Sequence, residues 1–200
     1  MLPALAIALS LLCAAPDFSR LAEGDIIFQE TSGRQSDAIA LATKSRYTHV
    51  GIVFREKGRW MVLEAVQPVS SIALERWIAR GVKRHYVVKR LAAAPGGIGP
   101  DAVQRMKAAA VKYLGRDYDE FFEWSDRRIY CSELVWKLYR ETLGVELAPR
   151  AKLGDFDLSA PAVRRELRRR YGGSVPVNEP VVPPSALFDS KLLVTVMAAP

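Results

Sequence analysis

The sequence predicts a single domain of the α+β class, and three observations lead to this prediction. The chain has 200 residues, half of them hydrophobic, which is enough for one complete core. Helical patterns of apolar residues alternate with short runs rich in β-branched residues. The clearest linker, residues 93–100, separates two halves that each lack a complete core. We therefore predict that residues 16–200 fold as one unit.

Residues 1–15 are predicted to be a signal peptide. The segment from Leu2 to Ala15 is apolar, uncharged and too short for a transmembrane span, and the polar Asp17 follows it. This predicts an exported, periplasmic protein, although no Lys or Arg precedes the apolar run. A lipid-modified Cys13 is an alternative use of the same segment.

The cysteine count points to a reactive thiol. The chain has two cysteines, Cys13 and Cys131. Removal of the leader leaves Cys131 alone, so it has no partner for an intramolecular disulfide. In an oxidising compartment, a solitary thiol is more typical of a reactive group than of a passive one.

The first predicted strand covers residues 24–29, and Ser36 is placed to cap a short helix that runs to Thr43. A second strand is predicted over residues 47–54. Its alternation puts Val50, Ile52 and Phe54 on one face, with His49, Gly51 and Val53 on the other.

A return strand is predicted over residues 59–65, after a four-residue loop at 55–58. With that loop, Phe54 pairs with Arg59, and His49 falls opposite Glu64. Directly opposed side chains have Cβ atoms about 4.5–5.5 Å apart, so the carboxylate could hold the imidazole. A histidine with a purely structural role is the alternative.

Further along the chain, a helix at 74–80 is predicted to end at Gly81, and a strand follows at 85–89. His85 is followed by an ordinary strand sequence, so we interpret it as structural. Asp101 is predicted to cap a helix that runs to Tyr113. From Gly154 onwards we predict a tail that wraps or docks on the domain. It consists of residues 154–160, the basic helix around 164–170 and the Pro-rich stretch 176–184, and a last strand is predicted at 192–197.

Cys131 is predicted to lie at or just before the start of a helix. Leu134, Leu138 and Leu143 recur behind it at helical spacing, and Gly144 stands where the helix should stop. Free backbone N–H groups and the positive end of the helix dipole favour a thiolate at such a position. A buried cysteine that acts as a small hydrophobic residue is the alternative.

Two further features of the sequence allow both a structural and a functional interpretation. An aromatic cluster precedes Cys131, and it either packs in the core or lines a cleft: Tyr118, Phe121, Phe122 and Trp124. The formal net charge is +7, and the basic run 164–170 is read first as the solvent face of a helix. An anionic partner, such as a membrane surface or a cell-wall polymer, is the alternative. No interleaved aromatic and basic pattern indicates nucleic acid.

Cysteine, histidine and carboxylate together suit acyl transfer through a thiol. Cys131 would attack the acyl carbon, His49 would activate the thiol and protonate the leaving group, and Glu64 would orient the imidazole. Backbone N–H groups near Cys131 would bind the oxyanion, with Tyr130 or Gln29 as candidates for a second donor. One cysteine and two widely spaced histidines do not form a zinc signature, so neither a metal nor a cofactor is predicted.

Five short motifs follow one another along the chain, at residues 24–28, 47–51, 63–65, 113–119 and 130–136. In this order they resemble the YiiX-type permuted papain-like cysteine hydrolases, relatives of the NlpC cell-wall endopeptidases and of lecithin retinol acyltransferase. The resemblance runs from Glu23 to about Val196 and includes residues 156–159. It implies a circularly permuted papain-like fold, in which an antiparallel sheet packs against the helix that carries the nucleophilic cysteine. It also implies a Cys-His-polar triad with the histidine first along the chain.

The expected function is therefore that of a thiol hydrolase that cleaves an amide through an acyl-enzyme, with a cell-wall peptide bond as the favoured substrate. A lipid acyl hydrolase or acyltransferase is the second candidate, because the aromatic cluster and the basic helix would supply an apolar cleft and weak membrane contact. A non-catalytic binding module on the same fold is the third. The sequence does not indicate an oligomeric state.

Overall fold

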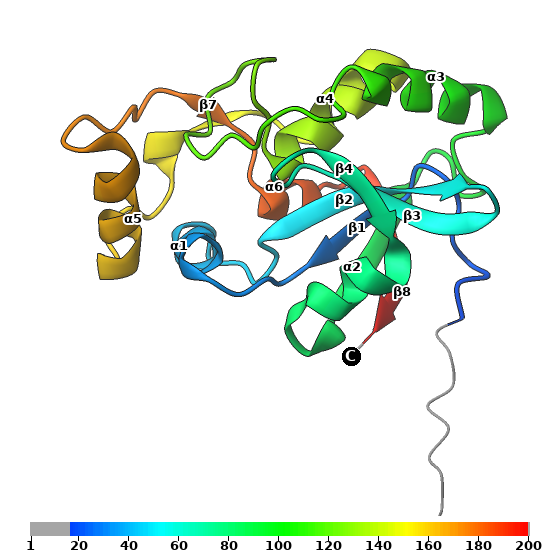
Figure 1. The fold of residues 1–200 in the computed structure, drawn as a ribbon, viewed down its shortest axis with the longest axis horizontal. Helices are drawn as coiled ribbons and strands as arrows, with labels where there is room; N and C mark the ends of the chain where they lie inside the picture. Colours follow the sequence, from blue (N-terminus) through cyan, green and yellow to red (C-terminus); the bar gives the residue numbers. More distant parts are fainter. Residues whose placement is uncertain (1–16, 200) are drawn as a thin grey trace, which may run out of the picture.

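The structure is a computed structural model that describes residues 17–199. The predicted signal peptide and Cys13 lie outside the described residues. A six-stranded antiparallel sheet forms the centre (Figure 1), with the strand order β4-β3-β2-β1-β5-β8. In chain order its strands are β1 (Ile26–Gln29), β2 (His49–Glu56), β3 (Arg59–Glu64), β4 (Ser70–Ala73), β5 (Tyr86–Leu91) and β8 (Leu193–Ala199). A small separate ribbon pairs β6 (Ala151–Lys152) with β7 (Pro180–Val181).

Helices surround this sheet. The α-helices are α1 (Arg34–Thr43), α2 (Leu74–Arg80), α3 (Pro100–Val111), α4 (Cys131–Leu143), α5 (Pro161–Tyr171) and α6 (Pro184–Phe188). Two short 3₁₀ turns are η1 (Val82–Arg84) and η2 (Leu153–Asp155). No helix in residues 17–199 has the length and apolar character needed to cross a membrane.

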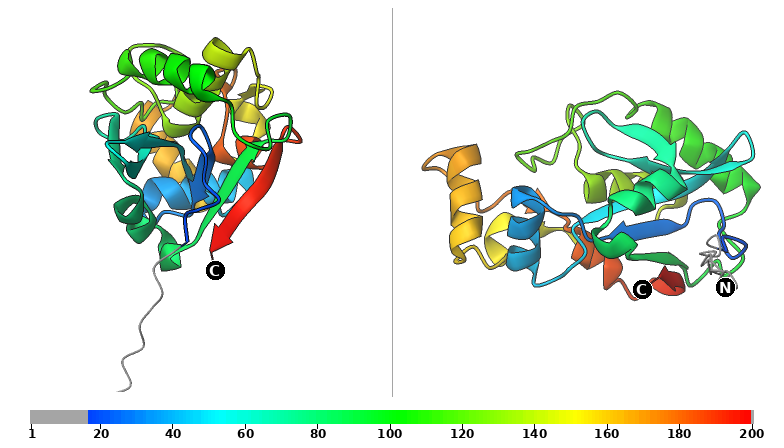
Figure 2. Two further views of the ribbon diagram at one scale, coloured as in Figure 1. Left: turned by 90° about the vertical axis from the view of Figure 1, so that its right-hand side faces the viewer. Right: turned by 60° about the horizontal axis from the view of Figure 1, so that its bottom comes forward.

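The sheet buries a different layer on each face. On one face α3 and α4 pack over Phe28, Val50 and Ile52 in the larger core cluster. On the other face α2 covers Ile27 and Val53 in a second cluster. Figure 2 shows these helices on opposite sides of the strands. The predicted alternation of the second strand is confirmed, since Val50, Ile52 and Phe54 belong to the larger cluster and Val53 belongs to the second.

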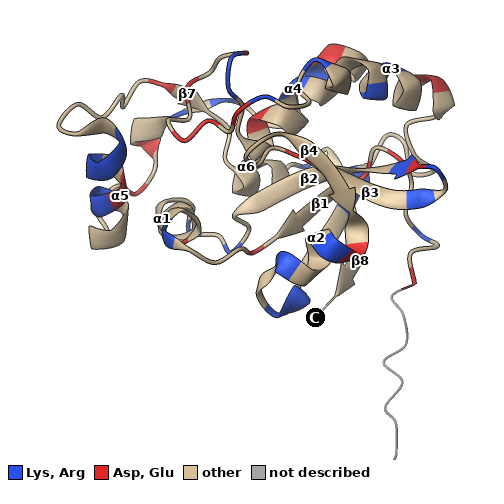
Figure 3. Ribbon diagram, viewed as in Figure 1, with Lys and Arg blue, Asp and Glu red and all other residues tan. Residues whose placement is uncertain are grey.

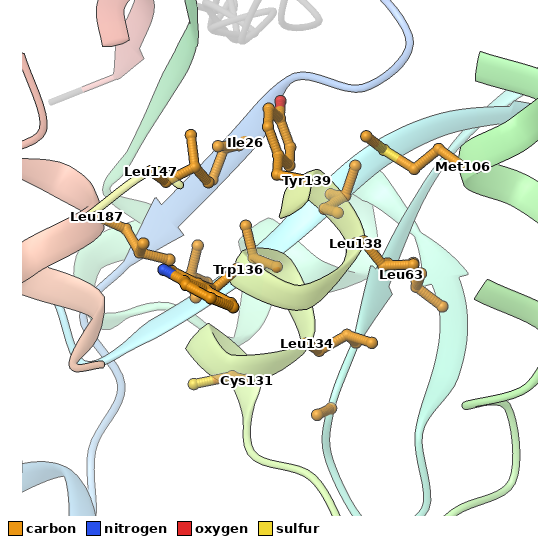
Figure 4. Packing of buried hydrophobic residues seen from close by; sticks show 14 of the residues in the cluster. Ile26, Leu63, Met106, Cys131, Leu134, Trp136, Leu138, Tyr139, Leu147 and Leu187 are labelled. Carbon is orange, nitrogen blue, oxygen red and sulfur yellow. The ribbon is translucent and has the colours of Figure 1, made fainter. Parts of the chain in front are cut away.

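Helix α4 begins at Cys131, as predicted, and it ends at Gly144, whose φ of 70° allows the left-handed C-cap. Leu134 and Leu138 are fully buried, one helical turn apart. Figure 4 shows them on the same helix as Cys131, which lies in its first turn. Packing of the apolar face of the helix against the sheet therefore determines where the thiol lies relative to the strands.

At one end of the sheet, α1 and α5 lie side by side, outside the two main layers (Figures 1 and 2). The predicted tail returns to the domain in three places. β7 pairs with β6, α6 contacts α4, and β8 extends the sheet beside β5. The last strand was predicted at 192–197, whereas β4 and α6 were not predicted.

The β2–β3 hairpin differs from the predicted one. The predicted four-residue loop at 55–58 would have paired Phe54 with Arg59, but Phe54 pairs with Met61. The connection is a two-residue turn at positions 57–58, where φ is 49° and 80°. Two left-handed residues match the twist of a tight hairpin, so β2 continues two residues beyond its predicted end at Phe54, while β3 begins at Arg59 as predicted.

The predicted direct opposition of His49 and Glu64 is consequently wrong. The side-chain period of a strand is two, so a shift by two residues leaves each side chain on its predicted face. His49 and Glu64 still share a face and meet across the strands on a diagonal.

Two predicted helix caps are also wrong. Helix α1 begins at Arg34 after Gly33, and Ser36 lies inside it, where its hydroxyl pairs with Thr31. Helix α3 begins at Pro100, which suits the first helical position because its missing N–H would be unpaired there. Asp101 is therefore in the first turn rather than at the cap, and the helix ends at 111 instead of 113.

Candidate active site

Cys131 is the first residue of α4 and is 3% exposed. The N–H groups of the first helical turn have no partner within the helix, and they lie at the same helix terminus as the thiol. Helix α4 packs against β2, the strand that begins with His49. Packing of the helix on the sheet therefore brings the thiol to the end of the sheet where the imidazole lies.

His49 interacts with both other predicted residues. Its Nε2 lies 2.6 Å from Oε2 of Glu64. Burial would lower the pKa of His49, but hydrogen bonding and charge interactions with Cys131 and Glu64 raise it to about 9. The imidazole is therefore held in its protonated form at neutral pH.

Glu64, the last residue of β3, is 1% exposed and accepts three hydrogen bonds. Its donors are His49, the indole Nε1 of Trp77 at 2.9 Å, and the guanidinium of Arg80. Burial would raise the pKa of Glu64, but the bonds and charges of His49 and Arg80 lower it. The carboxylate stays ionised and can stabilise an imidazolium.

Trp77 and Arg80 were not predicted as site residues. They are three residues apart on α2, so both project from the same side of that helix towards Glu64. The indole also stacks on the His49 ring, with the centroids 5.9 Å apart and the planes at 25°. The helix around them was predicted, but no local signal showed that this helix would cover the hairpin.

Tyr118 belongs to a hydrogen-bonded chain beside Cys131. Its hydroxyl accepts a bond from Nε2 of Gln35 at 2.7 Å, and Oε1 of Gln35 accepts one from Arg170 at 3.0 Å. Arg170 is paired in turn with Glu166 at 2.9 Å. Burial and the nearby Cys131 raise the pKa of Tyr118 well above its usual value, so the phenol keeps its proton. Because the amide of Gln35 donates, the phenol proton is free to point elsewhere.

An apolar cavity of about 100 Å³ opens beside Cys131. Its walls come from α1, from α5, from the segment around η2 and from the Pro-rich tail. The apolar side chains in these walls include Ala38, Ile39, Ala42, Leu153, Phe156, Leu158, Val163, Leu167, Val181, Val182 and Pro183. The tail that we predicted to dock on the domain thus forms part of the cavity wall.

A second cleft of about 470 Å³, lined by both polar and apolar side chains, lies on the side of His49. Thr31, Ser36, Thr48 and Arg80 are among its lining residues, and Tyr118 and Gln35 line both cavities. The thiol therefore faces an almost entirely apolar cavity, and the imidazole faces an adjoining cleft of mixed polarity.

The two candidates for a second oxyanion donor have different surroundings. The Tyr130 hydroxyl accepts a hydrogen bond from the N–H of Val182 at 3.1 Å. Gln29 is fully buried and lines the cleft beside His49, and neither amide atom has a partner among the described residues. His85 lies apart from both, with its Nε2 3.3 Å from the hydroxyl of Tyr47.

The aromatic cluster divides between the two roles considered for it. Tyr118 and Phe122 line the apolar cavity. Trp124 instead packs edge-on against Trp136, with centroids 5.1 Å apart, and Phe121 packs on Tyr171. The core interpretation therefore holds for Trp124, which packs against the larger core cluster, and the cleft interpretation holds for Tyr118 and Phe122, whereas Phe121 belongs to neither cluster.

The basic run lies on α5, which Figure 3 shows with blue residues along its length. Val163 and Leu167 point to the cavity, whereas Arg164, Arg165 and Arg168 are exposed. The helix is thus amphipathic, with its apolar stripe against α1.

Comparisons with known proteins place these observations in context. Residues 20–197 match a family described as permuted papain-like amidase enzymes, YaeF/YiiX, the C92 family of peptidases. The chain is 45% identical over 189 residues to YiiX of Escherichia coli strain K12, covering 94% of this chain and 92% of that protein. That relative is described as uncharacterized. The crystal structure of metalloprotein YiiX from Escherichia coli O157:H7 superposes with a TM-score of 0.84 at 45% identity, covering 88% of this chain and 97% of that one.

Proposed function

Because the chain belongs to the YaeF/YiiX family of permuted papain-like amidases, we propose that it cleaves an amide with Cys131 as nucleophile, His49 as acid and base, and Glu64 as orienting carboxylate. The observation that carries this proposal is the His49 ring, which is bound by Glu64 on one side and interacts with Cys131. A bridging imidazole of this kind is the arrangement that activates a thiol.

The reaction proceeds in two steps. The Cys131 thiolate attacks the carbonyl carbon to form a tetrahedral oxyanion. Collapse breaks the C–N bond, and the His49 imidazolium gives its proton to the departing amine, which leaves a thioester on Cys131. Water then attacks the thioester with His49 as base, and the acid product and free thiol are released. Glu64 stays ionised and holds the ring throughout.

Alkylation of the thiol tests this proposal. Iodoacetamide should modify Cys131 near neutral pH and abolish turnover, since the thiolate is paired with a protonated His49. A Cys13→Ala background removes the other thiol from the measurement. His49→Ala should slow the labelling markedly at the same pH. Labelling of Cys131 only at strongly alkaline pH, or turnover that survives full labelling, would contradict the proposal.

We assign the side-chain oxyanion donor to Tyr118 rather than to Tyr130 or Gln29. Tyr118 lines the cavity of Cys131, and Gln35 donates to its oxygen, so the phenol proton can turn to the developing oxyanion. Arg170 holds the carbonyl of Gln35 and so fixes which end of that amide faces the phenol. The N–H groups at the start of α4 supply the other donors.

Tyr118→Phe should therefore lower kcat by about 10²–10³-fold, the usual cost of one lost oxyanion donor, while KM changes little. Tyr86→Phe is the matched control, because that phenol contacts Met197 away from the site. The two variants should be compared by steady-state kinetics on one amide. An equal and small effect in both would show that Tyr118 only packs beside the thiol.

The crystallised relative is called a metalloprotein, so the fit of a metal to this chain matters. In residues 17–199, no group of three His, Cys, Asp or Glu side chains is arranged to hold a metal ion. Glu64 already uses both oxygens on His49, Trp77 and Arg80. The donors present thus do not fit a metal centre, and the proposed steps use only the thiol, the imidazole and the carboxylate.

The cellular location of the protein and the surfaces that it contacts determine which substrates it can reach. We propose export to the periplasm, on the basis of residues 1–15, which would give access to cell-wall peptides. The exposed arginines of α5 would favour weak contact with an anionic membrane surface. An acyl lipid is the second candidate substrate, and the apolar cavity beside Cys131 specifically favours it.

A further inference from the structure

We infer that Arg80 binds a carboxylate on the amine half of the scissile amide, so that the preferred leaving group is an amino acid with a free carboxylate. This inference rests on the proposed function, because it assumes that Cys131 takes the acyl half and that His49 protonates the departing amine. It adds the chemical class of the leaving group and the residue that selects it.

Arg80 reaches the cleft beside His49 from the last turn of α2. Both residues line this cleft of about 470 Å³. The Arg80 guanidinium donates to Oε1 of Glu64, whose Oε2 lies 2.6 Å from Nε2 of His49. The guanidinium and the imidazole are therefore separated by the width of one carboxylate. Because the amine receives its proton from His49, a carboxylate attached close to the amine nitrogen would lie within reach of Arg80.

The Arg80 guanidinium has donors that the protein itself does not use. A guanidinium carries five N–H donors in a planar fork, and within residues 17–199 the Arg80 side chain makes one hydrogen bond, to Glu64. The Arg80 side chain is 42% exposed, whereas that of Glu64 is 1% exposed. Glu64 thus anchors one edge of the guanidinium from the protein interior. The remaining N–H groups can bind a second carboxylate that enters the cleft.

The other residues that line the cleft within the described chain do not compete for this role. Glu120 is the one carboxylate among them, and it is paired with Arg169 at 3.5 Å. His49 is engaged by Glu64 and Cys131. Three lining hydroxyls carry no charge and bind one another at 2.7 and 2.9 Å, those of Thr31, Ser36 and Thr48. Arg80 is therefore the cation that a charged leaving group would meet.

The surface around Arg80 is also basic. Residues 74–84 contain one acidic side chain, Glu75, and four basic ones, of which Arg76, Lys83 and Arg84 are exposed alongside Arg80. Figure 3 shows blue residues on α2 accordingly. A surface of one charge sign raises the local concentration of ligands of the opposite sign. An anionic leaving group is therefore favoured on this side of the site.

Two pairs of amides test this inference. Each pair shares one acyl group, N-octanoyl in the first and N-acetylalanyl in the second, and within a pair the leaving group is either alanine or alaninamide. Alanine suits the cleft because its lining also includes the small apolar side chain of Ala65. The full-length protein should favour alanine over alaninamide in both pairs, by about ten- to a hundredfold in kcat/KM and mainly through KM, since a hydrogen-bonded charge pair is lost with the carboxylate.

Substitution of Arg80 should remove this preference. Arg80→Gln should bring the ratio of the two kcat/KM values close to one by raising KM for the alanine amide, and Arg80→Lys should keep part of the preference. Any loss of kcat that acts through Glu64 affects both members of a pair and cancels in the ratio. Arg76→Gln is the matched control, because this residue is exposed on the same helix but lies outside the cleft lining. It should keep the full preference.

Isothermal titration calorimetry on the Cys131→Ala protein separates this inference from the proposed function. N-octanoylalanine should bind more tightly than N-octanoylalaninamide, and adding Arg80→Gln should abolish the difference. Equal kcat/KM or equal affinity for the two compounds, or a preference that Arg80→Gln retains, would overturn the inference and leave the thiol mechanism standing. If the wild-type protein hydrolysed none of the four amides while binding still favoured the carboxylate, the proposed function would fail and carboxylate recognition by Arg80 would stand.

Discussion

Replacing Cys131 or His49 with alanine should remove amide hydrolysis almost completely, by roughly 10⁴-fold or more in kcat, because members of such a unit fail together. Without Cys131 no thioester can form. Without His49 the thiol loses its base, and the departing amine loses the proton donor that the raised pKa of about 9 provides. The double variant should be no slower than either single one, because each change already stops the same step.

We expect Cys131→Ala and His49→Ala to leave the protein folded, with little change in its thermal unfolding. Cys131 and His49 lie at the ends of α4 and β2, beside cavities rather than in the centre of the core. Thermal unfolding followed by circular dichroism provides the control, with Cys13→Ala as the reference protein. A folded Cys131→Ala or His49→Ala protein that keeps more than a small fraction of wild-type turnover would remove that residue from the mechanism.

Glu64→Gln should be the next most damaging change, with a loss in kcat of up to about 10⁴-fold. The amide oxygen can still accept from His49 and Trp77, but it has no charge to stabilise the imidazolium. Arg80 would face the new amide nitrogen and, being partly exposed, would turn to solvent. Measurable activity should remain, because the thiol and the imidazole are both still present.

Glu64→Gln should also shift the pH dependence of kcat to lower pH. The pKa of His49 is raised to about 9 partly by Glu64, so the proton donor is present below that pH and lost above it. Removing the carboxylate lets the imidazolium lose its proton at lower pH, so the alkaline limb of kcat should move down from near pH 9. Glu56→Gln, an exposed position on the neighbouring strand, is the matched control. An unchanged rate and an unchanged limb would place the orienting group elsewhere.

Local sequence pattern was sufficient to predict the helix that carries Cys131 and the strand that carries His49. Leu134, Leu138 and Gly144 defined α4 and put Cys131 in its first turn, because helical periodicity and a C-cap glycine are local signals. The alternation of residues around His49 is also a local signal, and it predicted which face of the sheet this side chain occupies.

Register was not determined by pattern, since registers that differ by two residues bury the same faces. The two-residue turn at 57–58 puts Lys57 in a left-handed conformation, which lysine seldom adopts and which no sequence rule would favour there. The prediction that His49 and Glu64 share a face survived this error only because the shift was even.

Contacts between distant segments were beyond sequence reasoning. Arg80 and Trp77 reach Glu64 from α2, and the chain Arg170, Gln35, Tyr118 links α5 and α1 to the thiol. Each contact depends on how helices pack, and helical periodicity shows that a face is buried without showing what covers it.

Trapping the acyl-enzyme tests the central claim most directly. The protein is mixed with an activated acyl ester, quenched in acid and measured by intact mass spectrometry with peptide mapping. The mechanism predicts a mass increase of one acyl group on the peptide that contains Cys131, formed and lost at rates compatible with turnover, and its absence in Cys131→Ala. Full turnover without that adduct, or an identical adduct in Cys131→Ala, would contradict catalysis through the Cys131 thiol.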